Sequence, residues 1–353
     1  MKKDAKILIC YNSPFSLFTV YNGKPENEDS IFIDSSETSL VNGIAKIKSL
    51  LSSHYTNVEA VALDSNIGQT IKKVNDYSPD IIFNFVESID GIASHEFCTA
   101  GLFELLGYEF TGNQPISLGN CLNKGRAKKI LNSSGIKVPK AIILSLDERD
   151  SINNFNLHYP VILKLLNEDA SIGISEFSVI HNEEQLVKQV EFLFDTYKQD
   201  IIAEEYIDGR EINAAVLGGK VLPLSEIIFE GLPEGLPKIV TYEGKWYEES
   251  IYYKYTKPNC PADIPKEIKI KIEETALKAY RALDCRDYAR VDIRLDRNNN
   301  PYVIEVNPNP DISIDSGFAR AAKASGLNYD KLLVTLAEFA LNRKKYDTQT
   351  KAG

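Results

Sequence analysis

Two acidic residues, Asp292 and Glu305, lie in two segments whose residue patterns predict the paired strands of a hairpin. In residues 290–295 and 302–307, apolar and polar side chains alternate as they do along a half-buried strand. Residues 296–301 are rich in Asn and end in Pro, which is typical of a turn. Positions 292 and 305 are equidistant from the centre of this turn, so a hairpin that closes symmetrically places the two carboxylates opposite each other.

The same alternation predicts which side chains share a face of the hairpin. The residues expected on one face are Val291, Ile293 and Leu295, together with Tyr302, Ile304 and Val306. The polar positions between them include Arg290, Asp292, Arg294, Glu305 and Asn307, whereas Val303 is an apolar residue placed in the polar set. One face of the hairpin is therefore expected to carry a compact group of charged and amide side chains.

This polar group predicts a metal site. Like charges placed opposite each other destabilise a sheet, and a cation between Asp292 and Glu305 removes that penalty. The two carboxylates and the amide oxygen of Asn307 are hard ligands, which suit Mg²⁺ or Mn²⁺ with phosphate oxygens completing the shell. The alternative is a solvated acidic hairpin that binds no metal.

A second chemical signal lies upstream, in the apolar strand pattern of residues 161–165. Lys164 stands inside this run, and a buried ammonium group is costly unless it is paired. The side chain therefore either reaches solvent or meets an anion. The following loop, residues 167–174, contains Gly173 among small and polar residues, and its backbone N–H groups could fold over phosphates. A lysine on a strand before such a loop is the order expected of a nucleotide-binding lid.

Length, charge and cysteine content exclude several classes of protein. A chain of 353 residues is long enough for two or three packed units. The net charge of −10 argues against nucleic-acid binding. Five scattered cysteines without a C-x-x-C pair predict neither disulfides nor zinc, and favour a reducing cytoplasm. No apolar run approaches the roughly 18 residues of a membrane span, and the first ten residues lack the pattern of a signal peptide.

Strand and helix patterns alternate along residues 6–112 and predict an α/β unit with a parallel sheet. Ligands bind beyond the carboxyl ends of the strands in such sheets. The loops at residues 11–14 and 87–91, with Glu87 in the second, are therefore candidates for contact with a substrate.

Four separated motifs resemble those of the ATP-grasp ligases, most closely the D-alanine–D-alanine ligase branch, over residues 80–342. They are Asn123-Lys-Gly-Arg-Ala-Lys128, the strand lysine with its glycine loop, residues 201–212, and the Arg-Val-Asp…Glu-Val-Asn hairpin. The resemblance implies an α/β ATP-grasp fold. Its parts would be a Rossmann-like substrate domain (1–114), a small lid subdomain (115–205) and a C-terminal α+β catalytic domain (206–353).

The resemblance also implies the site residues. Phosphate contacts fall to Lys124, Lys164, Ser171 and Gly173, and Mg²⁺ to Asp292, Glu305 and Asn307. Glu204 would accept from the adenine amino group, the backbone of Ile207 would contact the ring edge beside Tyr206, and Glu211 would bind the ribose. Arg290 would stabilise the transferred phosphate. For any single glutamate here, the alternative is a solvated surface residue.

The segment of residues 246–257 resembles the loop that closes over the family's site. In that loop a Lys-Tyr pair precedes Cys-Pro-Ala, and here Lys254-Tyr255 precedes Cys260-Pro-Ala262. Lys254 and Tyr255, with Ser171, are therefore expected to act in catalysis beside Arg290. The alternative is a β-excursion on the protein surface.

Three departures from the family pattern concern the substrate. No glutamate follows the first strand in residues 10–16, and the serine of the family's Glu-Ser-Tyr trio corresponds to Ala170, with Ser171 next to it. Asp311 replaces a glycine near the reacting centre. Ser316 matches the serine that binds the acceptor carboxylate, but Asp311 and Asp315 add negative charge, which favours an amine or a cationic side chain.

The predicted function is an ATP- and Mg²⁺-dependent ligase that joins a small-molecule carboxylate to an amine through an acylphosphate, with altered specificity. Two alternatives stay open: a true D-alanine–D-alanine ligase with a divergent first loop, and a non-catalytic ATP-binding protein on the same fold. The resemblance further implies a homodimer, and the net charge and the lack of a long apolar run predict no nucleic-acid or membrane partner.

Overall fold

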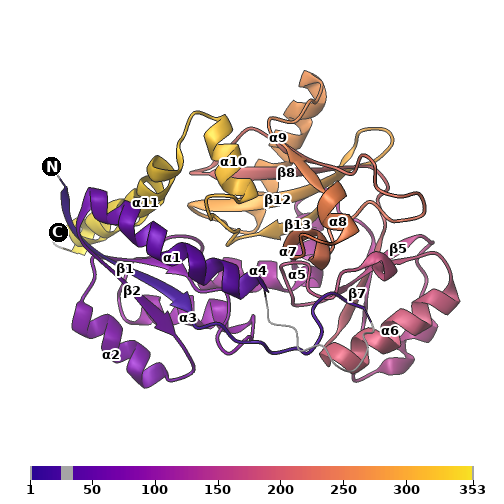
Figure 1. Ribbon diagram of the computed structural model, residues 1–353, viewed down its shortest axis with the longest axis horizontal. Helices are drawn as coiled ribbons and strands as arrows, with labels where there is room; N and C mark the ends of the chain where they lie inside the picture. Colours follow the sequence, from indigo (N-terminus) through magenta and orange to yellow (C-terminus); the bar gives the residue numbers. More distant parts are fainter. Residues whose placement is uncertain (1, 25–34, 352–353) are drawn as a thin grey trace.

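The computed structural model describes residues 2–24 and 35–351 and divides them among three sheets (Figure 1). The N-terminal unit contains β1 (Lys3–Asn12), α1 (Ser35–His54), β2 (Tyr55–Leu63), α2 (Ile67–Tyr77), β3 (Ile81–Phe85) and α3 (His95–Leu105). Its strands are parallel in the order β2-β1-β3, which confirms the predicted α/β alternation. None of the helices in the described ranges is both long and apolar enough to cross a membrane.

The second sheet is antiparallel, in the order β4-β7-β5-β6, and we call it the lid sheet. It contains β4 (Ala141–Leu144), β5 (Val161–Leu165), β6 (Val179–Ile180) and β7 (Ile201–Glu205). The helices in this part of the sequence are α4 (Pro115–Leu122), α5 (Lys124–Ser133) and α6 (Glu183–Tyr197), with 3₁₀ turns at Arg149–Asn154 (η1) and Glu176–Ser178 (η2). Leu163, Ile201 and Ala203 pack on α6, so the alternate residues of β5 and β7, including Lys164 and Glu204, face the opposite side.

The third sheet is the largest and has the order β11-β10-β8-β12-β13, with β9 paired to β8. Its strands are β8 (Arg210–Leu217), β9 (Lys220–Val221), β10 (Ser225–Ile228), β11 (Lys257–Asn259), β12 (Tyr288–Leu295) and β13 (Pro301–Asn307). The helices of this region are α7 (Tyr242–Trp246), α8 (Ile251–Tyr255), α9 (Lys266–Ala282), α10 (Gly317–Ala324) and α11 (Tyr329–Lys351). Helix α9 begins directly after Pro265, and its Ile272, Ala276 and Tyr280 are buried.

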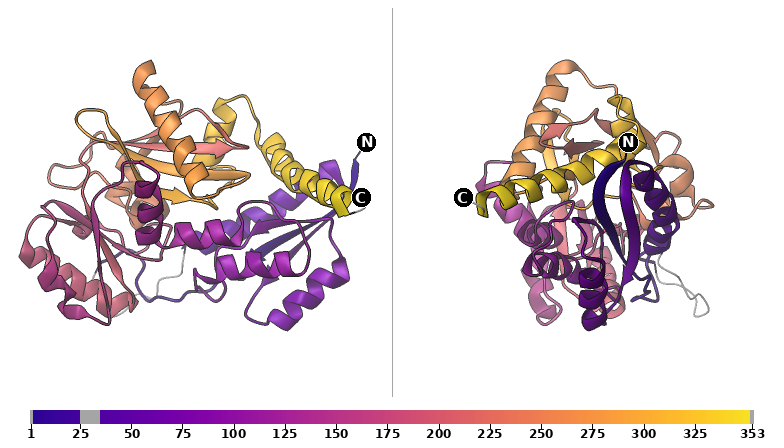
Figure 2. Two further views of the ribbon diagram at one scale, coloured as in Figure 1. Left: turned by 180° about the vertical axis from the view of Figure 1, so that it is seen from behind. Right: turned by 90° about the vertical axis from the view of Figure 1, so that its left-hand side faces the viewer.

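The helices tie these units together. In Figures 1 and 2, α11, in yellow, runs beside the N-terminal sheet. Leu332, Leu336 and Ala340 of α11 are buried in one core with Ile7 and Phe83 of that sheet. Residues of α5 pack likewise into the core of the third sheet. The domain boundaries after residues 114 and 205 stay a prediction.

In the hairpin β12–β13, Asp292 and Glu305 are paired as predicted, but the turn is not the symmetric one on which that prediction was based. Asp292 pairs with Glu305, whereas Ile293 pairs with Val303, so Ile304 is an extra residue that forms a bulge. The turn is therefore not symmetric about the predicted centre. The predicted face of β13 was wrong for the same reason: Val303 is buried in the core with Val306, three residues along, while Tyr302 and Ile304 are half-buried.

Candidate active site

The carboxylate of Asp292 accepts hydrogen bonds from donors on two strands. Arg290 donates to both oxygens of Asp292, from Nε at 2.7 Å and from Nη2 at 2.8 Å. Asn213 on the neighbouring β8 donates to Asp292 Oδ1 at 2.7 Å. Burial alone would lower the pKa of Arg290, but the Asp292 carboxylate outweighs it and raises that pKa. The ladder thus brings together Arg290, Asp292, Glu305 and Asn307, as expected from their spacing.

A buried lysine links the hairpin to the loop of residues 167–174, which we call the phosphate loop. Lys124 Nζ lies 3.5 Å from a carboxylate oxygen of Glu305 and 3.5 Å from one of Asp169. Burial would raise the pKa of Glu305, yet Lys124 and the neighbouring Lys164 hold it well below its usual value. Burial raises the pKa of Asp169 even though Lys124 opposes the shift. The sequence analysis missed Asp169, a polar residue in a loop of polar residues.

Lys245 on α7 is a further member of this cluster that the sequence analysis missed. Burial and the Arg290 guanidinium lower its pKa, while Glu305 and Asp292 oppose that shift, so the ammonium group is within electrostatic range of the hairpin. The predicted pair lies elsewhere: Lys254 and Tyr255 are exposed at the end of α8, and the Tyr255 ring lies against Gly231. The segment holds two lysine–aromatic pairs, Lys245-Trp246 and Lys254-Tyr255, and only the fold distinguishes them.

The donor set at the hairpin fits a hard divalent cation. Asp292 and Glu305 are directly paired, and Asn307 supplies an amide oxygen that accepts from the backbone N–H of Asn309 at 2.8 Å. In the part of the chain that the structure describes, no three His, Cys, Asp or Glu side chains form a metal cluster. A cation here would therefore have two carboxylates and an amide from the protein and take its other ligands from phosphate or water.

Glu204, a residue of the predicted nucleotide site, is shared by two lysines. Glu204 is 1% exposed, and its two oxygens lie 3.1 Å from Lys128 Nζ and 3.1 Å from Lys164 Nζ. Burial would raise the pKa of Glu204, but the two ammonium groups outweigh it and lower that pKa. Lys164 thus meets an anion, which is one of the two outcomes expected for it. Lys128, one turn after Lys124 on α5, was not predicted as a site residue.

Arg294 organises the predicted adenine and ribose residues. Its Nη2 donates to Glu211 at 2.6 Å and its Nη1 to the carbonyl of Ile207 at 3.2 Å. The guanidinium also lies over the Tyr206 ring, 5.3 Å from its centroid. Tyr206, Ile207 and Glu211 are therefore neighbours around one cation, whereas Glu204 points to the two lysines.

The phosphate loop has a strained backbone. Ala170, Ser171 and Gly173 all have positive φ, at 53°, 63° and 76°. Such angles cost non-glycine residues on the order of 1 kcal/mol or more and occur at ligand sites. Ser171 Oγ donates to the carbonyl of Val240 at 3.0 Å, which connects the loop to the segment just before α7.

The predicted substrate residues lie where the N-terminal unit meets the end of β13. Glu87 is half-buried, and its backbone N–H donates to Asn12 at 3.1 Å. Asp311 accepts from the backbone and hydroxyl of Ser313. Ser316 is buried, and its Oγ accepts from the N–H of Ala319 at the start of α10.

Glu96 is a buried carboxyl in the same region that the sequence analysis missed. Its Oε1 accepts from Asn309 Nδ2 at 2.8 Å. Burial, with a smaller contribution from Asp169, raises the pKa of Glu96 to about 8. Its position in the first turn of α3 is ordinary for a glutamate, and nothing local in the sequence marks it as buried.

Comparison with known proteins identifies the family. The family model described as the D-ala D-ala ligase C-terminus matches residues 130–338. A D-alanine–D-alanine ligase of Carboxydothermus hydrogenoformans is 33% identical over 319 residues, covering 88% of this chain and 95% of that protein. The uncharacterized protein y4sG of Sinorhizobium fredii is 34% identical over 268 residues, covering 74% of this chain and 75% of that protein.

Solved structures share the fold at lower identity. The D-alanine–D-alanine ligase from Bacillus anthracis complexed with ATP has a TM-score of 0.71 at 23% identity, over 97% of this chain and 99% of that one. The VanG D-Ala:D-Ser ligase from Enterococcus faecalis has a TM-score of 0.66 at 20% identity, over 95% of this chain and 99% of that one.

Proposed function

Because the chain belongs to the D-alanine–D-alanine ligase family of ATP-grasp enzymes, we propose that it joins a carboxylate to an amine with ATP and Mg²⁺ through an acylphosphate. The observation that carries the proposal is the hairpin, where Asp292 and Glu305 are paired beside Arg290 and Lys124. A binding protein has less need of two opposed carboxylates surrounded by cations. The substrates are small molecules, and the protein acts in the cytoplasm as a homodimer.

Each part of the site has a role in this proposal. Lys124, Lys164 and Arg290 neutralise the phosphoryl group as it moves. Tyr206, Ile207 and Glu211, which surround Arg294, hold the nucleoside. Asp292, Glu305 and Asn307 would hold Mg²⁺, which would supply positive charge to neutralise the phosphate groups. The phosphate loop, Ser171 and Lys245 enclose the reacting groups and exclude water from the acylphosphate. Lys254 and Tyr255, which are exposed at the end of α8, are given no role in this proposal.

We also propose that the specificity departs from that of D-alanine ligation. Glu87 and Asp311 each contribute a negative charge within electrostatic range of the Tyr288 hydroxyl, which donates to Asn309 at 2.9 Å. A carboxylate-rich surrounding disfavours a second simple amino-acid carboxylate and favours an amine or a cationic side chain. The competing candidate is D-alanine itself, which the 33% identity to a D-alanine–D-alanine ligase favours.

The test is release of phosphate from Mg·ATP with D- and L-amino acids and amines, singly and in pairs. We expect turnover with a pair that contains a basic or carboxylate-free amine, and its loss by at least about a hundredfold in Asp292→Asn and Glu305→Gln. Turnover with D-alanine alone would refute the altered specificity. Near-normal turnover in either variant would refute the metal assignment, and bound ATP without turnover in the whole panel would favour a binding protein.

A further inference from the structure

The segment Ser13–Lys24, which we call the arm, leaves β1 and crosses from the N-terminal unit to the lid sheet (Figure 1). The Phe18 ring packs edge-on against Tyr197 of α6, with centroids 5.1 Å apart. The N–H of Gly173 donates to the Tyr21 carbonyl at 2.8 Å, and Ser175 Oγ donates to the Gly23 carbonyl at 3.1 Å. The arm therefore contacts the phosphate loop directly, backbone to backbone.

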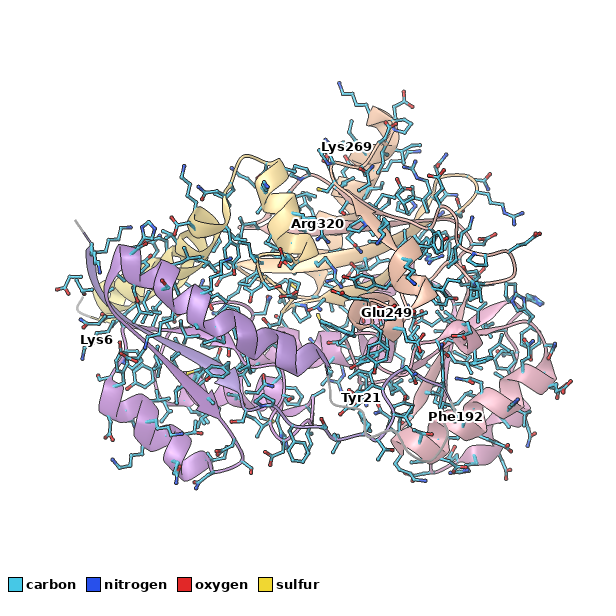
Figure 3. The ribbon with its side chains drawn as sticks, viewed as in Figure 1. Lys6, Tyr21, Phe192, Glu249, Lys269 and Arg320 are labelled. Atoms are coloured by element: carbon cyan, nitrogen blue, oxygen red, sulfur yellow. The ribbon has the colours of Figure 1, made fainter. Side chains whose placement is uncertain are left out.

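Gly23 shows how close this contact is. It has φ +72°, and a Cβ at this position would lie 2.2 Å from the carbonyl oxygen of Gly173. No side chain fits in that space, and an L-residue disfavours that φ. Figure 3 shows Tyr21 beside the lid, where its side chain is 2% exposed.

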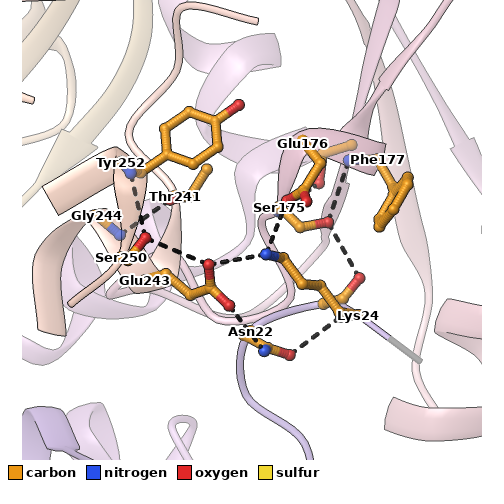
Figure 4. A network of polar contacts seen from close by, with 12 residues as sticks. Asn22, Lys24, Ser175, Glu176, Phe177, Thr241, Glu243, Gly244, Ser250 and Tyr252 are labelled. Carbon is orange, nitrogen blue, oxygen red and sulfur yellow. Dashed lines mark hydrogen bonds and ion pairs between the residues drawn. The ribbon is translucent and has the colours of Figure 1, made fainter. Parts of the chain in front are cut away.

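The same arm holds α7. The Tyr21 ring stacks on the buried Tyr242, with centroids 5.8 Å apart and an interplanar angle of 27°. Glu243, the next residue of α7, accepts from Asn22 at 3.2 Å and from Lys24 Nζ at 2.8 Å (Figure 4). Lys24 Nζ also lies 3.1 Å from Glu176 of the lid. One cation of the arm thus joins α7 to the lid.

Helix α7 is too short to be stable alone. It has five residues, whereas isolated helices shorter than about 12 residues are marginal in water. Its cap, the bond from Gly244 N–H to Thr241 Oγ1 at 2.9 Å, is local and does not fix its place in the fold. The position of α7 is therefore set by tertiary contacts. The Tyr242 ring and the Glu243 carboxylate contact the arm, and the Tyr242 N–H donates to the Ile174 carbonyl at 3.1 Å. Lys245 is the residue that follows them.

We propose that Tyr21 and Lys24 are positioning residues: they hold α7, the helix that carries Lys245, in place against the lid. The contacts that hold α7 join residues about 220 positions apart in the sequence. The effect on turnover rests on the proposed ligase function, whereas the seating of α7 does not.

The position of α7 can be monitored without measuring turnover, because Trp246 is the only tryptophan in the sequence and lies on α7. We expect Lys24→Ala to raise acrylamide quenching of its fluorescence about twofold in the full-length protein, because α7 opens locally. Lys24→Arg keeps the charge and should restore the wild-type value. The matched control is Lys3→Ala, which removes an exposed lysine paired with Glu338 at 2.6 Å. Unchanged quenching in Lys24→Ala would overturn the proposal.

The route through Lys245 is tested by a double-mutant cycle on turnover. We expect Lys24→Ala to lower kcat about tenfold in the wild-type background and not at all in Lys245→Ala, because the group it positions is then absent. Equal losses in both backgrounds would overturn the role of Lys245 as the link. If no substrate pair gives turnover, the ligase assignment fails while the fluorescence result still decides whether the arm seats α7.

Discussion

At the scale of single residues, Glu96 is a buried carboxyl that controls how stability depends on pH. Its pKa is raised to about 8 by burial, against about 4.3 in an unfolded chain. Folding therefore takes up a proton between these values, and the free energy of unfolding falls as the pH rises toward 8. Above pH 8 this contribution no longer changes, because both states are ionised.

We therefore expect Glu96→Gln to be increasingly stabilising, relative to wild type, as the pH rises from 5 to 8. The gain should be at most about 1.4 kcal/mol per pH unit, because Gln keeps the bond from Asn309 without a charge. Urea denaturation at several pH values measures it. The exposed Glu249→Gln variant is the control, and a difference for Glu96→Gln that does not vary with pH would contradict the prediction.

At the scale of elements, the turn between β7 and β8 is fitted tightly to the end of β12. A Cβ on Gly209 would lie 1.8 Å from the carbonyl oxygen of Leu295, which pairs with Arg210 in the ladder. We expect Gly209→Ala to cost about 2 kcal/mol of stability, because the two strands must separate. The separation would also disturb Arg294 and Glu211, so the KM for ATP should rise.

Chemical denaturation and ATP-dependent turnover measure these two effects. The control is Gly43→Ala in α1, where a Cβ has nothing within 4 Å and alanine should stabilise the helix by up to about 1 kcal/mol. A Gly209→Ala protein as stable as wild type would show that the turn can shift to accommodate a Cβ, and would contradict the prediction.

Sequence patterns predicted these elements better than their contacts. Alternation placed Asp292 and Glu305 on adjacent strands, and the ladder confirms that pair. It did not show the bulge at Ile304, because Tyr302, Ile304 and Val306 keep an unbroken alternation in the sequence, and the apolar Val303 was the one sign against it. Lys245 was missed because its segment has no periodicity that would favour it over Lys254. The arm contacts depend on residues far apart in the chain, and such pairs have no local signature.

At the scale of the whole molecule, one arginine near the end of α11 joins three parts of the chain. Arg343 binds Asp287 Oδ1 at 2.5 Å, Glu109 Oε2 at 3.0 Å and the carbonyl of Phe110 at 2.7 Å. The side chain of Asp287 is only 4% exposed. We expect Arg343→Ala to cost about 3 kcal/mol, because it leaves a buried carboxylate with weaker compensation.

Calorimetry of the full-length protein tests this, since the lost bonds join the N-terminal unit to the rest. Arg297→Ala is the control: it breaks an exposed pair with Asp208 and should cost less than about 1 kcal/mol. Equal effects of the two substitutions would mean that Asp287 needs no partner from α11.

The bulge at Ile304 has a consequence for how this hairpin tolerates insertions and deletions over evolution. It separates the turn, residues 296–300, from the pairs that hold Asp292 and Glu305. Lengthening the turn leaves those pairs in register, so relatives are free to vary there. Deleting one residue at the bulge instead reverses the side chains on one side of it, and either Glu305 and Asn307 leave the site or Val303 leaves the core. Length variation among relatives should therefore gather in the turn and be absent from residues 301–307.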